Sequence, residues 1–170
     1  MAAALHALDY LAHPAKHPAP GVCVTFGDEP FLKREVLALL RREVLGGGDG
    51  DFSLTSLEGR SATLRDVLDE LATLSLFGDS GRRLVVVEGA DEFVSANRAA
   101  LEDFVAKPRP ASVLLLELKT FPATTRLYKA VAATGLLIDC APPTAAKLQK
   151  WLVGWARDRH EIKLEGAAAE

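Results

Sequence analysis

Apolar residues along the chain form short continuous runs that alternate with longer segments of helical periodicity. The runs predict five β-strands, at Val22–Phe26, Phe52–Leu57, Leu84–Glu88, Val113–Leu118 and Leu136–Cys140. Three of these runs consist almost entirely of Leu, Val and Ile, which is typical of strands covered on both faces and hence of a mainly parallel sheet. The pattern predicts an α/β fold with a five-stranded, mainly parallel sheet and helices on both faces.

The segments between the strands have local signals for helix starts and stops. Helices are expected over residues 1–12, Pro30–Leu45, Ala62–Thr73, Glu92–Val105 and Ala123–Thr134. Pro30 suits the first turn of a helix, Ser61 or Thr63 suits an N-cap, and Gly135 suits a helix end. We also expect the last strand to pair with the first, which would bring their cysteines, Cys23 and Cys140, close together as buried, reduced thiols.

The character of the chain changes after Pro142 and Pro143. Thr144 is a candidate N-cap for a helix whose apolar positions include Trp151 and Trp155 at a spacing of one turn. We expect a first domain over residues 1–141, and the start of a small helical second domain, lid-like and truncated, over residues 142–170.

Composition limits the classes of function. The chain has 170 residues, 49% of them hydrophobic, with a formal net charge of −3 and two cysteines. These values suit one well-packed core and argue against a strongly basic nucleic-acid binder or a disulfide framework. No apolar stretch approaches the ~18 residues of a membrane span. We therefore expect a cytoplasmic protein with no membrane contact.

The turn after the first strand has the layout of a phosphate-binding loop without its chemistry. Gly27 and Lys33 stand at the offsets that such a loop requires, but Leu32 replaces the second glycine and Arg34 replaces the residue that holds Mg²⁺. Pro30 also removes a backbone donor. The alternative is an ordinary strand-to-helix turn, and in either case tight Mg·ATP binding is not expected.

The end of the third predicted strand supports the same interpretation. A working ATPase of this layout would carry Asp there, often followed by Glu, whereas this chain has Glu88 followed by Gly89. Gly27, Lys33 and Glu88 thus predict a degenerate nucleotide site, with no catalytic residue and no cofactor. The scattered histidines and the two cysteines do not have metal-ligand spacing, so no metal site is expected.

The segment between the second predicted helix and the third strand is unusually apolar. Leu74, Ser75, Leu76 and Phe77 precede Gly78-Asp79, so two large apolar side chains fall at an expected turn. Such side chains can anchor a partner protein. The alternative is that they pack under the sheet edge as part of the core.

Several of these motifs occur together, in order, in one family. They are GDEPFLKRE from Gly27, LFGD from Leu76, RLVVVEGAD from Arg83, FPATTRLYKA from Phe121, and IDC from Ile138, followed by the helix KLQKWLVGWA from Lys147. On these residues the chain resembles the N-terminal part of the delta subunit of the bacterial DNA polymerase III clamp loader.

The resemblance implies an AAA+-like (P-loop NTPase-like) first domain that does not hydrolyse ATP. It also implies a hydrophobic wedge, matched here by Leu76 and Phe77 with Leu74 and Ser75 beside them, that binds the sliding clamp (the beta subunit) and helps to open it. Ala72 departs from the family pattern, where a full clamp-binding motif often begins with Gln. The implied partners are the clamp, the other clamp-loader subunits through a C-terminal domain not included in this chain, and DNA indirectly.

Three other functions can be compared with this one. A two-component receiver-like phospho-acceptor domain would also place acids after the first and third strands, but it needs Asp where this chain has Glu88. An active ATPase would need the residues missing around Lys33. DNA binding through Arg34, Arg41 and Arg42 is a weaker alternative, because a basic helix face is usually solvated.

Overall fold

Six strands and the helices between them make up the computed structural model, which describes residues 4–46, 53–73, 82–109 and 111–164. The strands are β1 (Leu5–His6), β2 (Val22–Phe26), β3 (Leu54–Glu58), β4 (Arg83–Glu88), β5 (Ser112–Leu118) and β6 (Leu136–Asp139). The helices are α1 (Ala7–Ala12), the short 3-10 helix η1 (Pro14–Lys16), α2 (Pro30–Leu45), α3 (Leu64–Ala72), α4 (Asp91–Ala96), α5 (Arg98–Ala106), α6 (Arg126–Thr134) and α7 (Ala145–His160).

The sheet has the strand order β1-β6-β2-β5-β4-β3, and its neighbouring strands all pair in parallel. The predicted parallel α/β fold is therefore confirmed. The predicted pairing of the last strand with the strand at Val22–Phe26 is confirmed as well, since β6 pairs with β2. The predicted strand number of five is wrong, because Leu5 and His6 pair with β6 and add a sixth strand at the edge. A strand of two residues is too short to show an alternating pattern in the sequence. Its pairing is therefore decided by the tertiary structure alone.

Helix boundaries differ from the predictions where polar side chains bond to the backbone. The single helix predicted over Glu92–Val105 is two helices, because Asn97 leaves helical geometry and its side chain donates to the Phe93 carbonyl at 2.9 Å. Helix α6 begins later than predicted because the Thr125 hydroxyl caps it, accepting the N–H of Tyr128 at 3.2 Å. Helix α2 has the predicted bounds.

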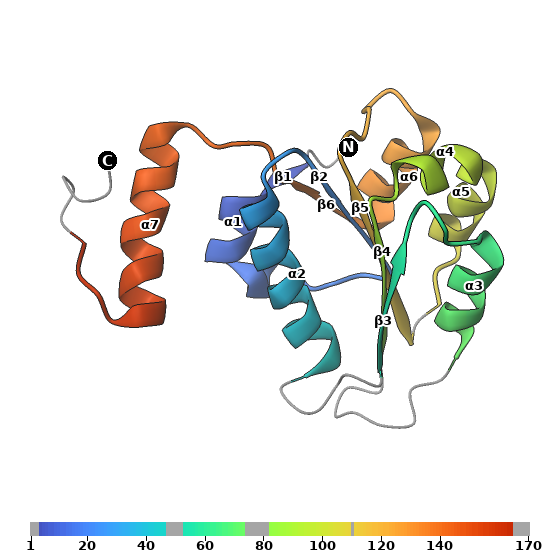
Figure 1. The fold of residues 1–170 in the computed structure, drawn as a ribbon, viewed down its shortest axis with the longest axis horizontal. Helices are drawn as coiled ribbons and strands as arrows, with labels where there is room; N and C mark the ends of the chain where they lie inside the picture. Colours follow the sequence, from blue (N-terminus) through green and yellow to red (C-terminus); the bar gives the residue numbers. More distant parts are fainter. Residues whose placement is uncertain (1–3, 47–52, 74–81, 110, 165–170) are drawn as a thin grey trace.

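The helices form two layers, one on each face of the sheet (Figure 1). Helices α1 and α2 cover one face, and α3 to α6 cover the other. Successive side chains of β4 point to opposite cores: Leu84 and Val86 pack with α1 and α2, whereas Val85 and Val87 pack with α3 to α6. This double burial explains why the central strands are unbroken apolar runs.

Helix α7 stands to one side of the α/β body, beyond α1 and α2 (Figure 1). Its predicted cap is confirmed, since the Thr144 hydroxyl accepts the N–H of Lys147 at 3.4 Å. Trp151 and Trp155 each lie edge-on to the Phe31 ring of α2, at 6.1 and 6.4 Å between ring centroids. Among the described helices, none is long and apolar enough to cross a membrane.

Candidate functional site

Ligands of open parallel sheets bind outside the carboxyl ends of the strands, where neighbouring connections leave to opposite faces. In this chain that point lies between β2 and β5. The connection after β2 leads to α2 on one face, and the connection after β5 leads to α6 on the other. The predicted degenerate site is located here, because Gly27 follows β2 directly and Lys33 lies in the first turn of α2.

The turn after β2 is packed against the ends of its two neighbouring strands. The Gly27 N–H donates to the carbonyl oxygen of Lys119 at 3.1 Å, and the Glu29 N–H donates to that of Cys140 at 3.1 Å. The Glu29 side chain accepts the N–H of Phe31 at 3.2 Å and caps α2. These N–H groups are therefore committed to protein oxygens, whereas a phosphate-binding loop needs its donors for the ligand.

Gly27 is required at this position by both its backbone and its surroundings. Its φ is +122°, a conformation that L side chains rarely adopt. A Cβ at Gly27 would lie only 2.5 Å from the backbone nitrogen of Ala141 and closer still to the carbonyl carbon of Cys140. The glycine therefore lets the turn approach the end of β6 closely.

Lys33 links the first turn of α2 to the end of β5. Its ammonium donates to the Leu118 carbonyl at 2.8 Å and lies 3.7 Å from a carboxylate oxygen of Glu117. Its side chain is only 13% exposed. The cation that would meet the phosphates of a nucleotide is thus neutralised and held by β5.

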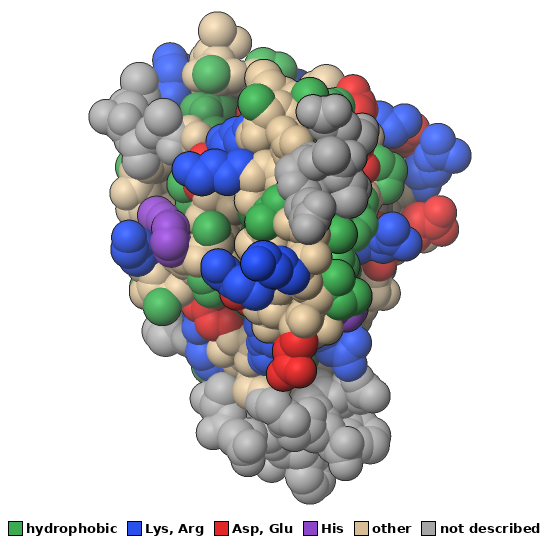
Figure 2. Space-filling view, turned by 90° about the vertical axis from the view of Figure 1, so that its left-hand side faces the viewer, with side chains coloured by type: hydrophobic (Ala, Val, Ile, Leu, Met, Phe, Trp, Pro, Cys, Tyr) green, Lys and Arg blue, Asp and Glu red, His purple; other side chains and the backbone are tan. Residues whose placement is uncertain are grey.

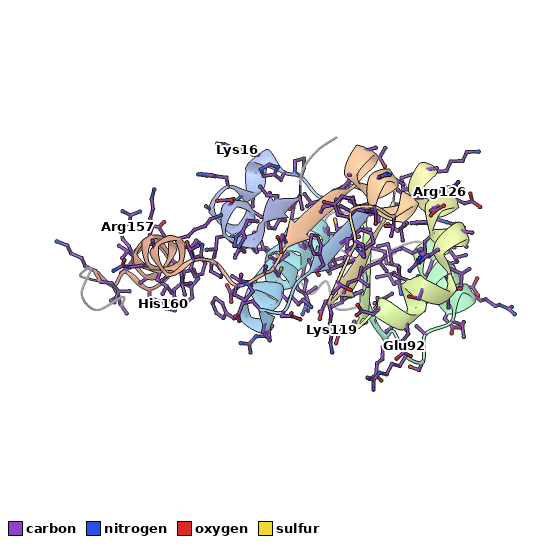
Figure 3. All side chains as sticks on the ribbon, turned by 90° about the horizontal axis from the view of Figure 1, so that it is seen from above. Lys16, Glu92, Lys119, Arg126, Arg157 and His160 are labelled. Atoms are coloured by element: carbon purple, nitrogen blue, oxygen red, sulfur yellow. The ribbon has the colours of Figure 1, made fainter. Side chains whose placement is uncertain are left out.

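The acidic residues at the end of β4 and just after it also have partners within the protein. Glu88 accepts a hydrogen bond from the hydroxyl of Ser56 on the neighbouring strand β3. Asp91 accepts the backbone N–H of Lys119 from both carboxylate oxygens at 3.1 Å. Figure 3 shows Lys119 and Glu92 extending outward on one side of the molecule. Both acids near the end of β4 hold neighbouring elements together.

The structure brings Gly27 and Lys33 to one place, the end of β5, whereas Glu88, the last residue of β4, bonds to Ser56 on β3. Sequence reasoning missed Glu117, the partner of Lys33. The signal was present, because Glu117 is the one charged residue in the apolar run Ser112–Leu118. Every second residue of a strand points to the same face of the sheet. Val113 and Leu115 pack on the face covered by α1 and α2, which indicates that Glu117 points to that face too.

The predicted clamp contacts Leu74, Ser75, Leu76 and Phe77 lie outside the described residues. The structure shows only what flanks them: α3 ends at Ala72 and β4 begins at Arg83. Since α3 returns the chain to the start of β4, these flanks lie at the amino ends of the strands, opposite the Gly27 turn.

The two cysteines are both buried, as expected, and burial raises the pKa of each thiol to about 12. The expectation that they lie close together is wrong. The register places Cys23 beside Leu136, four residues before Cys140, which separates the cysteines by about 13 Å along the sheet. In the described part of the chain, acids, histidines and cysteines form no group suited to holding a metal ion.

A groove of about 800 Å³, not predicted from the sequence, lies between α7 and the pair α1 and α2. Apolar side chains such as Leu8, Leu39 and Trp151 line it together with charged ones such as Arg42 and Lys150. Figure 2 looks onto the side of the molecule that carries α7 and shows Lys and Arg side chains spread among apolar ones. The charges are of both signs, since Asp9, Glu35 and Asp158 also line the groove.

Comparison with known proteins gives a family match. A sequence model of the family described as DNA polymerase III, delta subunit, matches residues 24–141. Comparison with curated proteins gives no match.

Three solved structures illustrate the similarity in fold. A DNA clamp loader delta protein of Bacillus subtilis has a TM-score of 0.76 and 21% identity, over 96% of this chain and 50% of that one. A DNA polymerase III gamma subunit-related protein of Thermotoga maritima has a TM-score of 0.53 and 16% identity, over 89% and 51%. A RuvB mutant of the same organism has a TM-score of 0.51 and 14% identity, over 96% and 51%.

At these identities the solved structures show the fold, which is the predicted AAA+-like α/β fold with a parallel sheet. The chain spans about half the length of each. The comparisons do not support the receiver-like alternative.

Proposed function

Because the chain belongs to the DNA polymerase III delta subunit family, we propose that it is a non-catalytic clamp-loader subunit that binds the sliding clamp and helps to open the ring. The observation that carries the proposal is the family match over residues 24–141, with the bond between Lys33 and the end of β5 as support for the absence of catalysis. The loaded ring would then act on primed DNA in the cytoplasm.

The clamp-binding wedge consists of Leu76 and Phe77, with Leu74 and Ser75 beside them. This assignment rests on the sequence motif and its place between α3 and β4. Burial of each large apolar side chain in a clamp pocket contributes about 1.5–3 kcal/mol. A ligand opens a ring only if it binds the open or strained form more tightly than the closed one, so the wedge must discriminate between the two forms.

The proposed subunit does not use ATP itself. The N–H groups of Gly27 and Glu29 and the ammonium of Lys33 bond to the ends of β5 and β6, so these groups are not available to phosphates. The energy for rearrangement would then come from other clamp-loader subunits. Equilibrium titration with a fluorescent ATP analogue tests this point, and Mg²⁺-dependent binding in the micromolar range would contradict it.

We infer a domain boundary near residue 141, with residues 142–170 forming the start of a lid-like helical domain. The separate position of α7 after Pro142 and Pro143 supports this division. Contacts with other clamp-loader subunits would be made by a more C-terminal region, and contact with DNA would be indirect.

A clamp-binding assay tests the proposed function. Leu76→Ala combined with Phe77→Ala should weaken binding to an immobilised cognate clamp at least about 100-fold, the equivalent of about 3 kcal/mol. Ile162→Ala is the matched control, because Ile162 is a large apolar residue that is 53% exposed elsewhere on the chain. An unchanged dissociation constant for the double variant would remove the basis for the wedge.

A further inference from the structure

The groove of about 800 Å³ between α7 and the pair α1 and α2 is long enough to hold a helix. Two of its walls are single faces of long helices, and both helices run downward from the top in Figure 1. The α7 wall extends from Lys147 to Asp158, which is about 16 Å at the helical rise of ~1.5 Å per residue. This length corresponds to about three helical turns.

The inner surface of the groove is apolar and is open within both long walls. Leu11, Leu39 and Trp151 line it and are only half-buried. Ala38 on α2 and Gly154 on α7 have the smallest side chains, and a Cβ added at Gly154 would meet nothing within 4 Å. Glycine inside a helix is less stable than alanine, but it allows another backbone to come close. The groove therefore offers apolar contacts and room for a bound segment.

The acidic side chains that line the groove have partners within the protein. The Lys147 ammonium donates to a carboxylate oxygen of Asp9 at 2.9 Å. Asp158 forms an ion pair with the neighbouring Arg157 at 2.8 Å. Glu35 is not without a partner either. Contacts inside the chain thus already balance the negative charges of this surface.

Two of the basic side chains that line the groove are not balanced in this way. Arg42 on α2 and Lys150 on α7 are both exposed, and within the described ranges neither side chain has an ion pair or a hydrogen bond. They lie on different walls, so a segment placed between them would meet a positive charge on each side. Such a surface favours a partner with carboxylates and disfavours a basic one.

We propose that this groove binds an acidic amphipathic helix of a partner protein. The apolar face of that helix, with residues at i, i+3, i+4 and i+7, would pack on Leu39 and Trp151, and its carboxylates would pair with Arg42 and Lys150. The inference does not rest on the proposed clamp binding. The groove lies on the face covered by α1 and α2, whereas α3, which precedes the proposed wedge, covers the opposite face.

Selection from a helical peptide library tests the proposal without a known partner. Leucine is fixed at i, i+3, i+4 and i+7, the other positions are random, and the chain is the immobilised target. We expect the selected peptides to be enriched in Asp and Glu. A fluorescein-labelled peptide from this selection should bind Arg42→Glu at least about tenfold more weakly. Arg34→Glu, an equally exposed change on α2 outside the groove, should alter the dissociation constant less than about twofold.

Two further variants separate binding in the groove from an effect on folding. Gly154→Leu fills the open space with a residue that favours a helix, so it should weaken peptide binding at least about tenfold while circular dichroism stays unchanged. The double variant Arg42→Glu, Lys150→Glu should bind a peptide with Lys in place of its acids better than the unaltered chain does. Damage to the fold would not reverse the charge preference in this way, so the exchange also serves if Gly154→Leu does not fold.

Three results would overturn the proposal. The first is that no peptide is selected, or that the selected peptides are not acidic. The second is that Gly154→Leu binds the selected peptide as well as the unaltered chain does, because the peptide would then bind elsewhere. The third is that sedimentation shows a dimer of the chain which Gly154→Leu abolishes, because the occupant would then be a second copy.

Discussion

Replacing Gly27 by alanine tests whether the turn after β2 is closed against the sheet. At φ +122°, an L residue costs about 1–3 kcal/mol in backbone strain. The new Cβ would also lie 2.5 Å from the nitrogen of Ala141 and closer still to the carbonyl carbon of Cys140. Both are backbone atoms, so relief requires the strands to move apart, at a further cost of about 1–3 kcal/mol. We expect Gly27→Ala to lower the free energy of unfolding by about 4 kcal/mol in total.

Two other glycines separate the contributions to this loss. Gly89 has φ +56°, but an added Cβ would meet nothing within 4 Å, so Gly89→Ala should cost only about 1 kcal/mol. Gly154 lies inside α7 with open space around it, so Gly154→Ala should stabilise the helix by up to about 1 kcal/mol. Urea unfolding followed by circular dichroism measures all three variants. The explanation is refuted if the unfolding free energies of Gly27→Ala and Gly89→Ala differ by less than about 1 kcal/mol. The close contact with Cys140 would then contribute little to stability.

Three further predictions concern ionisation, thiol access and the docking of α7. The hydrogen bond from Arg83 lowers the pKa of Glu70 in the folded state, so its stabilising effect is present above the ordinary value of 4.5 and is lost as pH falls through the lower folded value. Urea unfolding over a pH series should therefore show the stability difference between the unaltered chain and Glu70→Gln vanishing in acid, and a constant difference would contradict it. Cys23 and Cys140 should not react with iodoacetamide at about pH 8 until urea unfolds the chain, because buried thiols with raised pKa values form little thiolate. Mass spectrometry of the alkylated protein measures this. Phe31→Ala should shift the tryptophan fluorescence of α7 to longer wavelength, because both indole rings lose their contact with the Phe31 ring, and an unchanged spectrum would argue against this docking.

Much of the fold follows from local patterns in the chain. The apolar run of β2 and the Pro30 start of α2 predict the bounds of both elements, because burial on both faces and helix-end chemistry depend on nearby residues. The prediction was wrong at Leu5–His6 and at Asn97, where a strand of two residues and a helix break are set by contacts with other parts of the molecule or by one side chain.

For the candidate site, the sequence by itself determined that Gly27 and Lys33 are present but that the other residues of a nucleotide-binding loop are missing. Only the tertiary structure decided what those residues do instead. Lys33 bonds to the carbonyl of Leu118, 85 positions away along the chain, and Gly27 packs against Cys140. No local pattern specifies such partners, because parallel strands bring together residues whose separation in sequence is set by the intervening helices.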